Sequence, residues 1–225
     1  MQKIAVIFYG PPGSGKGTQA NLLMQKGELI HFDTGRFLEA IFYDPKRQHE
    51  KAVQREKKLF ETGMLITPSF VTGEVINEVK RMAAAKWGLA FSGSPRTMYE
   101  AERVFPVLEK AYGKKNIYIF RLFVRPEDSI KRNSNRRICL VCGAIMLSAY
   151  HPANSPKRCP VCAGPLYRRT LDKPEVIKRR IMEYRERTEP IFAYVKKRGH
   201  KIRVIDARPA PYKIFKKIVA QLPKK

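Results

Sequence analysis

The chain has 225 residues, of which 44% are apolar and 10% aromatic. This is enough for one hydrophobic core with a small insertion, and it excludes a disordered chain. The charge is unusual, because 45 Lys and Arg residues against 20 Asp and Glu residues give a net charge of +25. This excess indicates either a solvated basic surface or a polyanionic partner such as nucleotide phosphates or nucleic acid.

Short apolar stretches typical of buried strands alternate along the chain with amphipathic stretches typical of helices. In chain order the pattern predicts a strand at 3–9, a helix at 16–26, a strand at 28–33, helices at 35–43, 52–61 and 69–87, a strand at 89–92, a helix at 99–112, a strand at 116–124, helices at 126–135 and 175–197, a strand at 201–206 and a helix at 212–221. This alternation predicts an α/β fold in which helices cover both faces of a parallel five-stranded sheet.

Local signals mark two helix starts and one insertion. Thr67 precedes a proline in the position of an N-cap residue. Asp172 lies three residues before Glu175, a spacing that predicts a capping box. Residues 136–171 interrupt the alternation and contain all four cysteines, so we expect them to form an inserted subdomain.

A glycine-rich loop connects the first expected strand to the first expected helix. It reads Gly-Pro-Pro-Gly-Ser-Gly-Lys-Gly-Thr over residues 10–18, which is the spacing and the strand–helix context of a phosphate-binding loop. Its glycines allow backbone N–H groups to turn toward an anion, and the helix N-terminus adds partial positive charge. We expect Lys16 to reach the β- and γ-phosphates and Thr18 to offer its hydroxyl to Mg²⁺ or to a phosphate.

The four cysteines form two pairs with metal-ligand spacing. Cys139 and Cys142, then Cys159 and Cys162, each enclose two residues, and 16 residues separate the pairs. No segment has the length of a membrane span or the form of a cleaved signal, so we expect a cytosolic protein with reduced thiols. The pattern therefore predicts a closed, structural Zn²⁺ site, with His151 an ordinary loop residue; free thiols or disulfides are the alternative.

Together these motifs resemble the adenylate kinases, or nucleoside monophosphate kinases generally, of the type with a long zinc-binding lid. The resemblance covers nearly the whole chain. It is carried by the phosphate loop with Gln19, Thr34-Gly35, 63–67, 93–97, Arg132, Arg136-Arg137, the cysteine pairs, 166–169, 178–180 and 205–207. It implies a P-loop kinase core at 1–33, 68–135 and 172–225. It also implies a helical monophosphate-binding subdomain at 34–67 and a lid at 136–171.

The activity implied by the resemblance is reversible phosphoryl transfer from Mg·ATP to AMP, which gives two ADP. The implied ATP-binding residues are Gly13, Ser14, Gly15, Lys16, Gly17, Thr18, Arg132 and Ala207. The implied monophosphate-binding residues are Thr34, Arg36, Ile66, Gly93, Arg96, Glu100, Arg169 and Arg180. The implied catalytic residues are Lys16, Arg96, Arg132, Arg136, Arg169 and Arg180. Arginine suits this chemistry because it stays protonated and binds phosphate oxygens through a planar fork.

Two departures from the family pattern concern the residues expected at the metal and at the phosphate group of the monophosphate. Where the family usually has Asp-x-x-Arg after a Thr-Gly pair, this chain has Arg36 and Glu39. Ser92 stands where the family has the aspartate that orders water around Mg²⁺, and Asp33 is the nearest acidic substitute.

A third departure concerns the acceptor base. Glu100 occupies the position of the glutamine that reads adenine. An ionised glutamate only accepts hydrogen bonds, which suits a base edge that presents two donors, such as guanine. We expect AMP as the first acceptor, followed by relaxed or altered specificity.

Two alternatives remain at this level. One is a kinase for GMP, UMP or CMP. The other is a non-enzymatic zinc-ribbon protein that binds nucleotide or RNA, favoured by the +25 charge, the cysteine pairs and the missing aspartate. Against it, the basic residues lack the interleaved aromatics of a base-stacking surface. We therefore expect a monomer with ATP, AMP and ADP as partners, and neither a membrane nor a specific nucleic acid.

Overall fold

The computed structural model describes residues 3–27, 29–62, 64, 66–147 and 156–223. Among these residues, one sheet contains five strands: β1 (Ala5–Tyr9), β2 (Ile30–Phe32), β3 (Leu89–Phe91), β4 (Ile117–Phe123) and β8 (Ile202–Asp206). The strand order is β2-β3-β1-β4-β8, and every neighbouring pair is parallel. The predicted five-stranded parallel sheet is confirmed.

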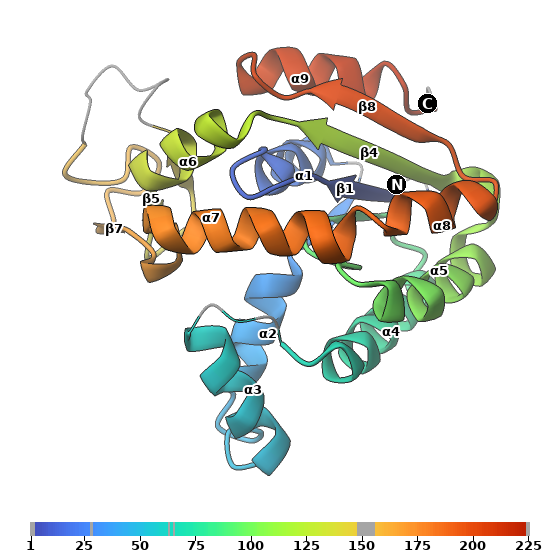
Figure 1. The fold of residues 1–225 in the computed structure, drawn as a ribbon, viewed down its shortest axis with the longest axis horizontal. Helices are drawn as coiled ribbons and strands as arrows, with labels where there is room; N and C mark the ends of the chain where they lie inside the picture. Colours follow the sequence, from blue (N-terminus) through green and yellow to red (C-terminus); the bar gives the residue numbers. More distant parts are fainter. Residues whose placement is uncertain (1–2, 28, 63, 65, 148–155, 224–225) are drawn as a thin grey trace.

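Helices cover both faces of this sheet (Figure 1). They are α1 (Lys16–Gln25), α2 (Thr34–Phe42), α3 (Lys51–Glu61), α4 (Pro68–Ala84), α5 (Met98–Tyr112), α6 (Pro126–Asn135), α7 (Pro174–Glu183), α8 (Ile191–Lys197) and α9 (Pro211–Val219), with short 3₁₀ turns η1 (Lys114–Asn116) and η3 (Thr170–Asp172). Within the described ranges, no helix combines the length and the apolar character needed to cross a bilayer.

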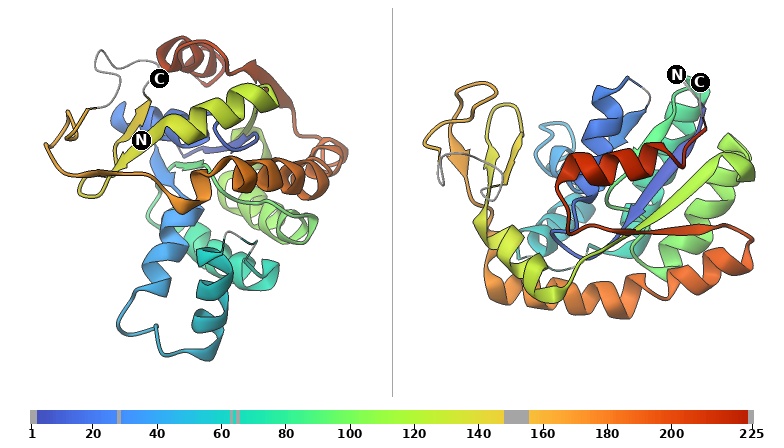
Figure 2. Two further views of the ribbon diagram at one scale, coloured as in Figure 1. Left: turned by 60° about the vertical axis from the view of Figure 1, so that its left-hand side comes forward. Right: turned by 90° about the horizontal axis from the view of Figure 1, so that it is seen from above.

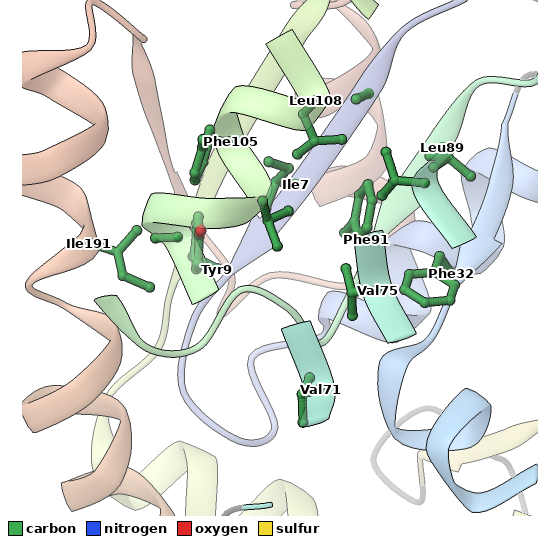
Figure 3. Close-up of a cluster of buried hydrophobic side chains, with 14 of the residues drawn as sticks. Ile7, Tyr9, Phe32, Val71, Val75, Leu89, Phe91, Phe105, Leu108 and Ile191 are labelled. Carbon is green, nitrogen blue, oxygen red and sulfur yellow. The ribbon is translucent and has the colours of Figure 1, made fainter. Parts of the chain in front are cut away.

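Two hydrophobic clusters lie on opposite faces of the sheet because successive side chains of a strand alternate in direction. On β1, Ala5, Ile7 and Tyr9 belong to a cluster with α4, α5 and α8, while Val6 and Phe8 belong to a cluster with α1 and α9. Figure 3 shows the first cluster, with Ile7 and Tyr9 between side chains from the flanking helices. The central strand is therefore buried on both faces, and its carboxyl end leads directly into the glycine-rich loop.

Two parts of the chain extend away from this core. Helices α2 and α3 project from the body as an antiparallel pair in Figure 1 and in the left view of Figure 2. Strands β5 (Arg136–Cys139), β6 (Ile145–Leu147) and β7 (Leu166–Tyr167) form a separate antiparallel sheet in the order β6-β5-β7. This small sheet contains one cysteine of the first pair and lies at the end of the molecule where α6 ends and α7 begins (Figure 1).

The structure corrects two local predictions in the last third of the chain. The helix expected at 175–197 is divided, because a π-turn over Tyr184–Thr188, called η4, separates α7 from α8. Pro190 follows the π-turn and has no N–H for a helical hydrogen bond. The expected capping box is also wrong: Lys173 is the N-cap residue of α7, and Asp172 instead accepts two hydrogen bonds from Arg136.

Candidate active site

The backbone path of the glycine-rich loop requires glycine at several positions. Gly10 and Gly13 have φ angles of 151° and 73°, in the region that L side chains rarely adopt. A Cβ atom at Gly13 would lie 2.5 Å from Nδ2 of Asn133, and one at Gly10 would lie 2.6 Å from the Leu122 carbonyl oxygen. The loop is thus packed tightly between β4 and α6.

Lys16 opens α1 and folds back over this loop. Its Nζ donates hydrogen bonds to the carbonyl oxygens of Gly10 (2.6 Å) and Pro11 (2.9 Å). Burial, together with the nearby charges of three arginines, lowers the pKa of Lys16 from 10.5 to about 7, and Asp33 opposes this shift. The ammonium group is therefore desolvated, and a bound phosphate would stabilise its charged form.

A cavity of about 740 Å³ opens beside the loop and collects most of the predicted residues. Its wall includes Gly13, Ser14, Gly15, Lys16, Gly17, Thr18, Arg36, Gly93, Arg96, Arg132, Arg136, Arg169 and Arg180. Four predicted residues within the described ranges lie outside the wall: Thr34, Ile66, Glu100 and Ala207. The loop, α2, α6, the small sheet and α7 thus converge on a single site.

Positive charge dominates this cavity. Of the described residues in its wall, the basic ones are Lys16, Arg36, Arg96, Lys131, Arg132, Arg136, Arg169, Arg180 and Arg187, and the acidic ones are Asp33, Glu39, Asp128 and Glu183. Nine cations therefore face four acids. Burial, together with the charges of neighbouring arginines, lowers the pKa of Arg180 to about 9. A site with this charge balance favours a multiply charged anion.

Three of the arginines are held in place by hydrogen bonds to other parts of the chain. Arg136 donates two hydrogen bonds of 2.6 Å to the buried carboxylate of Asp172. Arg132 donates to the carbonyl oxygens of residues 207 (2.7 Å) and 208 (2.9 Å). Arg96 donates from Nε to the Gly93 carbonyl (2.6 Å). These contacts orient the guanidinium groups before any ligand binds, which lowers the cost of reorganisation during a reaction.

The four cysteine sulfur atoms lie close together in the small sheet and its loops. All lie within 4.8 Å of one another, with Cys139 and Cys162 at 3.4 Å and Cys142 and Cys159 at 3.7 Å. All four thiols are free. Ligands 2.3 Å from a tetrahedral Zn²⁺ stand ~3.8 Å apart, so this donor set fits a four-thiolate metal site.

Backbone N–H groups also point at two of these sulfur atoms. The Cys142 N–H donates to the Cys139 sulfur (3.5 Å), and the Val161 N–H donates to the Cys159 sulfur (3.4 Å). The first of these bonds is the main reason that the pKa of the Cys139 thiol falls to about 6. Such donors favour the thiolate form that a metal requires. His151 lies outside the described residues.

Comparisons with known proteins identify the family. A sequence model of the adenylate kinase family matches residues 8–200 of the chain. An adenylate kinase of Caldicellulosiruptor bescii is 34% identical over 194 residues, which are 86% of this chain and 87% of the relative. An adenylate kinase of Archaeoglobus fulgidus is 33% identical over the same coverage, and one of Geotalea daltonii is 31% identical over 96% of this chain and 98% of the relative. The chain belongs to the adenylate kinase family.

Glu100, which stands where the family has a glutamine, forms several hydrogen bonds at the start of α5. Its buried carboxylate accepts hydrogen bonds from the hydroxyls of Ser94 (2.9 Å) and Thr97 (3.1 Å) and from the Arg96 N–H (3.1 Å). Its own N–H donates to the hydroxyl of Thr97 (3.3 Å), the N-cap residue of α5. Burial raises the pKa of Glu100, and these donors oppose the rise. A role of Glu100 in reading the base stays a prediction.

Thr34 and Gly93 form a close contact where α2 meets β3. A Cβ atom at Gly93 would lie 2.9 Å from the Thr34 Cβ, so only glycine allows this approach. The Thr34 hydroxyl is buried and has no hydrogen-bond partner among the described residues. A buried polar atom without a partner is costly unless a ligand or water satisfies it. A contact of this hydroxyl with a monophosphate stays a prediction.

The second departure places Arg36 between the two projecting parts of the molecule. Its Nη2 donates a hydrogen bond of 2.8 Å to the carbonyl oxygen of Gly143, which belongs to the turn of the first cysteine pair. Arg36 also lines the cavity, as does Glu39 one turn later on α2. The guanidinium thus links the helical segment to the cysteine-bearing sheet directly.

Sequence reasoning missed several residues of the cavity wall, among them Asn21, His31, Tyr184 and Arg187. His31 did carry a signal, because it is a polar residue within an apolar strand and lies two positions before Asp33. Arg187, which pairs with Glu183 at 2.8 Å, carried none. It faces the cavity through the π-turn, and the sequence predicted an uninterrupted helix there.

Proposed function

We propose that this chain transfers the terminal phosphoryl group of Mg·ATP to AMP and forms two ADP. The carrying observation is the convergence of Lys16, Arg96, Arg136 and Arg180 on one cavity whose other wall is the phosphate-binding loop. Phosphoryl transfer needs little covalent help from a protein. It needs two phosphate groups held in line and cations around the charge that spreads during transfer.

In this proposal, one end of the cavity binds the phosphoryl donor and the other end binds the acceptor. The loop and Arg132 would hold the donor, with Lys16 at the β- and γ-phosphates. Arg96 and the Thr34 hydroxyl would hold the acceptor phosphate. The bond from the γ-phosphorus to the β,γ-bridging oxygen breaks while an AMP phosphate oxygen bonds to the same phosphorus, so ATP leaves as ADP and AMP becomes ADP. Arg136, Arg169 and Arg180 would neutralise the charge on the transferring group.

The donor end also fits a magnesium ion. Thr18, Asp33 and Ser92 line the cavity and offer hydroxyl and carboxylate oxygen atoms, which are the ligands that Mg²⁺ and its bound waters prefer. When bound with ATP, the ion would neutralise charge on the β- and γ-phosphates. Asp33 uses one carboxylate oxygen to accept from the Gly35 N–H (3.0 Å) at the start of α2. Its second oxygen is left for such contacts.

We further propose that residues 34–67 act as the monophosphate-binding subdomain and residues 136–171 as a lid, on a core of 1–33, 68–135 and 172–225. Both segments project from the main sheet, and both carry cavity-lining arginines. Closure would exclude water that otherwise competes as the acceptor. A structural Zn²⁺ on the four cysteines would supply the rigidity that so small a sheet cannot obtain from its own core.

The remaining assignments of this proposal are a cytoplasmic location and a monomeric state. Free thiols arranged as metal ligands suit a reducing compartment. A single chain contributes both the phosphate-binding loop and the arginines to one cavity, so one copy is sufficient for the reaction as proposed.

A direct product assay tests the proposal. Purified chain is incubated with Mg·ATP and, in parallel, with AMP, GMP, UMP or CMP, and the diphosphates are separated and counted. We expect two ADP for each AMP consumed, and Lys16→Met should lower the rate by about 10³-fold or more. Faster turnover of another monophosphate would reassign the acceptor. Equal rates for the two proteins, or no turnover with any acceptor, would refute the proposal and favour a nucleotide-binding protein.

A further inference from the structure

Three polar side chains form a continuous chain of hydrogen bonds at the donor end of the cavity. His31 lies in β2, Ser92 follows the carboxyl end of the neighbouring strand β3, and Asn21 lies on α1. The His31 Nε2 is 2.7 Å from the Ser92 hydroxyl oxygen, and its Nδ1 is 2.5 Å from the Asn21 side-chain oxygen. All three residues line the cavity that also contains Thr18 and Asp33.

The chemistry of these atoms sets the direction of each hydrogen bond. The Asn21 side-chain oxygen only accepts, so the His31 Nδ1 must carry a hydrogen and donate it. In a neutral imidazole, Nε2 is then an acceptor, and the Ser92 hydroxyl must donate to it. Because the Ser92 hydrogen is engaged by His31, its lone pairs are left to face the cavity.

We propose that Asn21 and His31 act as positioning residues that turn the Ser92 hydroxyl into an obligate hydrogen-bond acceptor for water bound to the nucleotide's divalent cation. The inference rests on the proposed function, because it assumes that Mg·ATP occupies the donor end. It also explains how a neutral serine stands where the family has an aspartate. A carboxylate accepts in any orientation, whereas a free hydroxyl can also present its hydrogen to the water.

We call the hydrogen-bonded chain from Asn21 through His31 to Ser92 the relay. Together with Asp33, it replaces the aspartate that the family has at position 92. Asp33 supplies negative charge, and its carboxylate is oriented by the N–H groups of Gly35 (3.0 Å) and Arg36 (3.3 Å). Ser92 supplies a directed acceptor without adding charge. His31 and Asn21 touch no transferring atom in this scheme, so their effect reaches the cation only through Ser92.

Metal affinity is the appropriate test, because it can be measured without turnover. Mn²⁺ replaces Mg²⁺, and its binding to protein saturated with the non-hydrolysable analogue β,γ-imido-ATP is followed by electron paramagnetic resonance. Ser92→Ala and His31→Phe should each weaken Mn²⁺ binding by about three- to tenfold, the usual effect of one neutral hydrogen bond. The affinity for the analogue without metal should change by less than about twofold, which also shows that the variants fold.

Two further comparisons separate the relay from a merely structural role. If His31 acts only through Ser92, the double variant should bind Mn²⁺ no more weakly than either single variant. In a Ser92→Asp background, His31→Phe should have no effect on Mn²⁺ binding, because a carboxylate needs no orientation. Asn21→Leu removes the acceptor for the His31 Nδ1 and should weaken Mn²⁺ binding as His31→Phe does.

Several results would overturn the relay. Additive losses in the double variant, or unchanged Mn²⁺ affinity in Ser92→Ala, would show that Ser92 does not accept from metal-bound water. Nitrogen-15 chemical shifts that place the His31 hydrogen on Nε2 would reverse the direction of the chain. A failure of the proposed function has a different signature, since turnover of AMP would then be absent from the unmodified protein itself.

Discussion

Replacing Lys16 with methionine should abolish phosphoryl transfer and, at the same time, stabilise the ligand-free protein. The reason is that the Lys16 ammonium is buried among three arginines while only Asp33 opposes them. Methionine has a similar length and no charge, so it removes the desolvation cost and the repulsion. The expected gain therefore reflects a functional group that is maintained at the expense of stability.

The size of the effect follows from the pKa of Lys16. A fall from 10.5 to about 7 makes the charged form more costly in the folded protein than in the unfolded chain. At ~1.4 kcal/mol for each pH unit, the cost at pH 7 is ~4 kcal/mol. The hydrogen bonds to the Gly10 and Pro11 carbonyls, ~1 kcal/mol each, are lost in the variant. A net gain of ~2 kcal/mol remains, which corresponds to ~4–8 °C in Tm.

The gain in stability of Lys16→Met should decrease as the pH rises. The cost of the buried charge is fully present below pH 7 and disappears as the pH rises toward 10.5, where the unfolded chain also loses the proton. Urea unfolding at pH 6, 7, 8 and 9 measures this, with Lys213→Met on α9 as a control that removes the same charge from an exposed position. A gain no larger than that of Lys213→Met at pH 7, or one that does not shrink with pH, would refute the reasoning.

The remaining predictions concern proton uptake, the Arg136 contact and the metal site. ATP binding should restore the charge of Lys16. Titration calorimetry in buffers of different ionisation enthalpy should therefore show uptake of ~0.9 proton at pH 8 and almost none at pH 6. Equal proton uptake at both pH values would contradict this. Asp172→Asn should lower the free energy of unfolding by ~3 kcal/mol, because the carboxylate is only 3% exposed and its loss leaves Arg136 unpaired. As a control, Asp206→Asn removes a carboxylate from an exposed ion pair and should lower the free energy of unfolding by less than ~1 kcal/mol. Cys159→Ser should remove the bound metal and speed proteolytic cleavage within 136–171 while the main sheet stays folded. A full metal content in this variant would contradict the four-cysteine site.

The sequence by itself determined the features that depend on neighbouring residues. Alternating apolar stretches identified all five strands of the main sheet, because a strand buried on both faces needs a continuous apolar run. The phosphate-binding loop was readable for a similar reason, since Gly10 and Gly13 must adopt positive φ angles within a few residues of Lys16. The two cysteine pairs also carry their chemistry in local spacing.

Only the tertiary structure decided which distant residues meet. Asp172 has the spacing of a helix cap, yet it pairs with Arg136, which lies 36 positions earlier. Arg36 donates to Gly143, 107 positions later, and His31 contacts Ser92 through the pairing of β2 with β3. A local pattern lists the hydrogen bonds that a side chain is able to make. Which of them forms depends on how the sheet, helices and projecting segments pack, because a polar group satisfies itself with the partner that folding brings within reach.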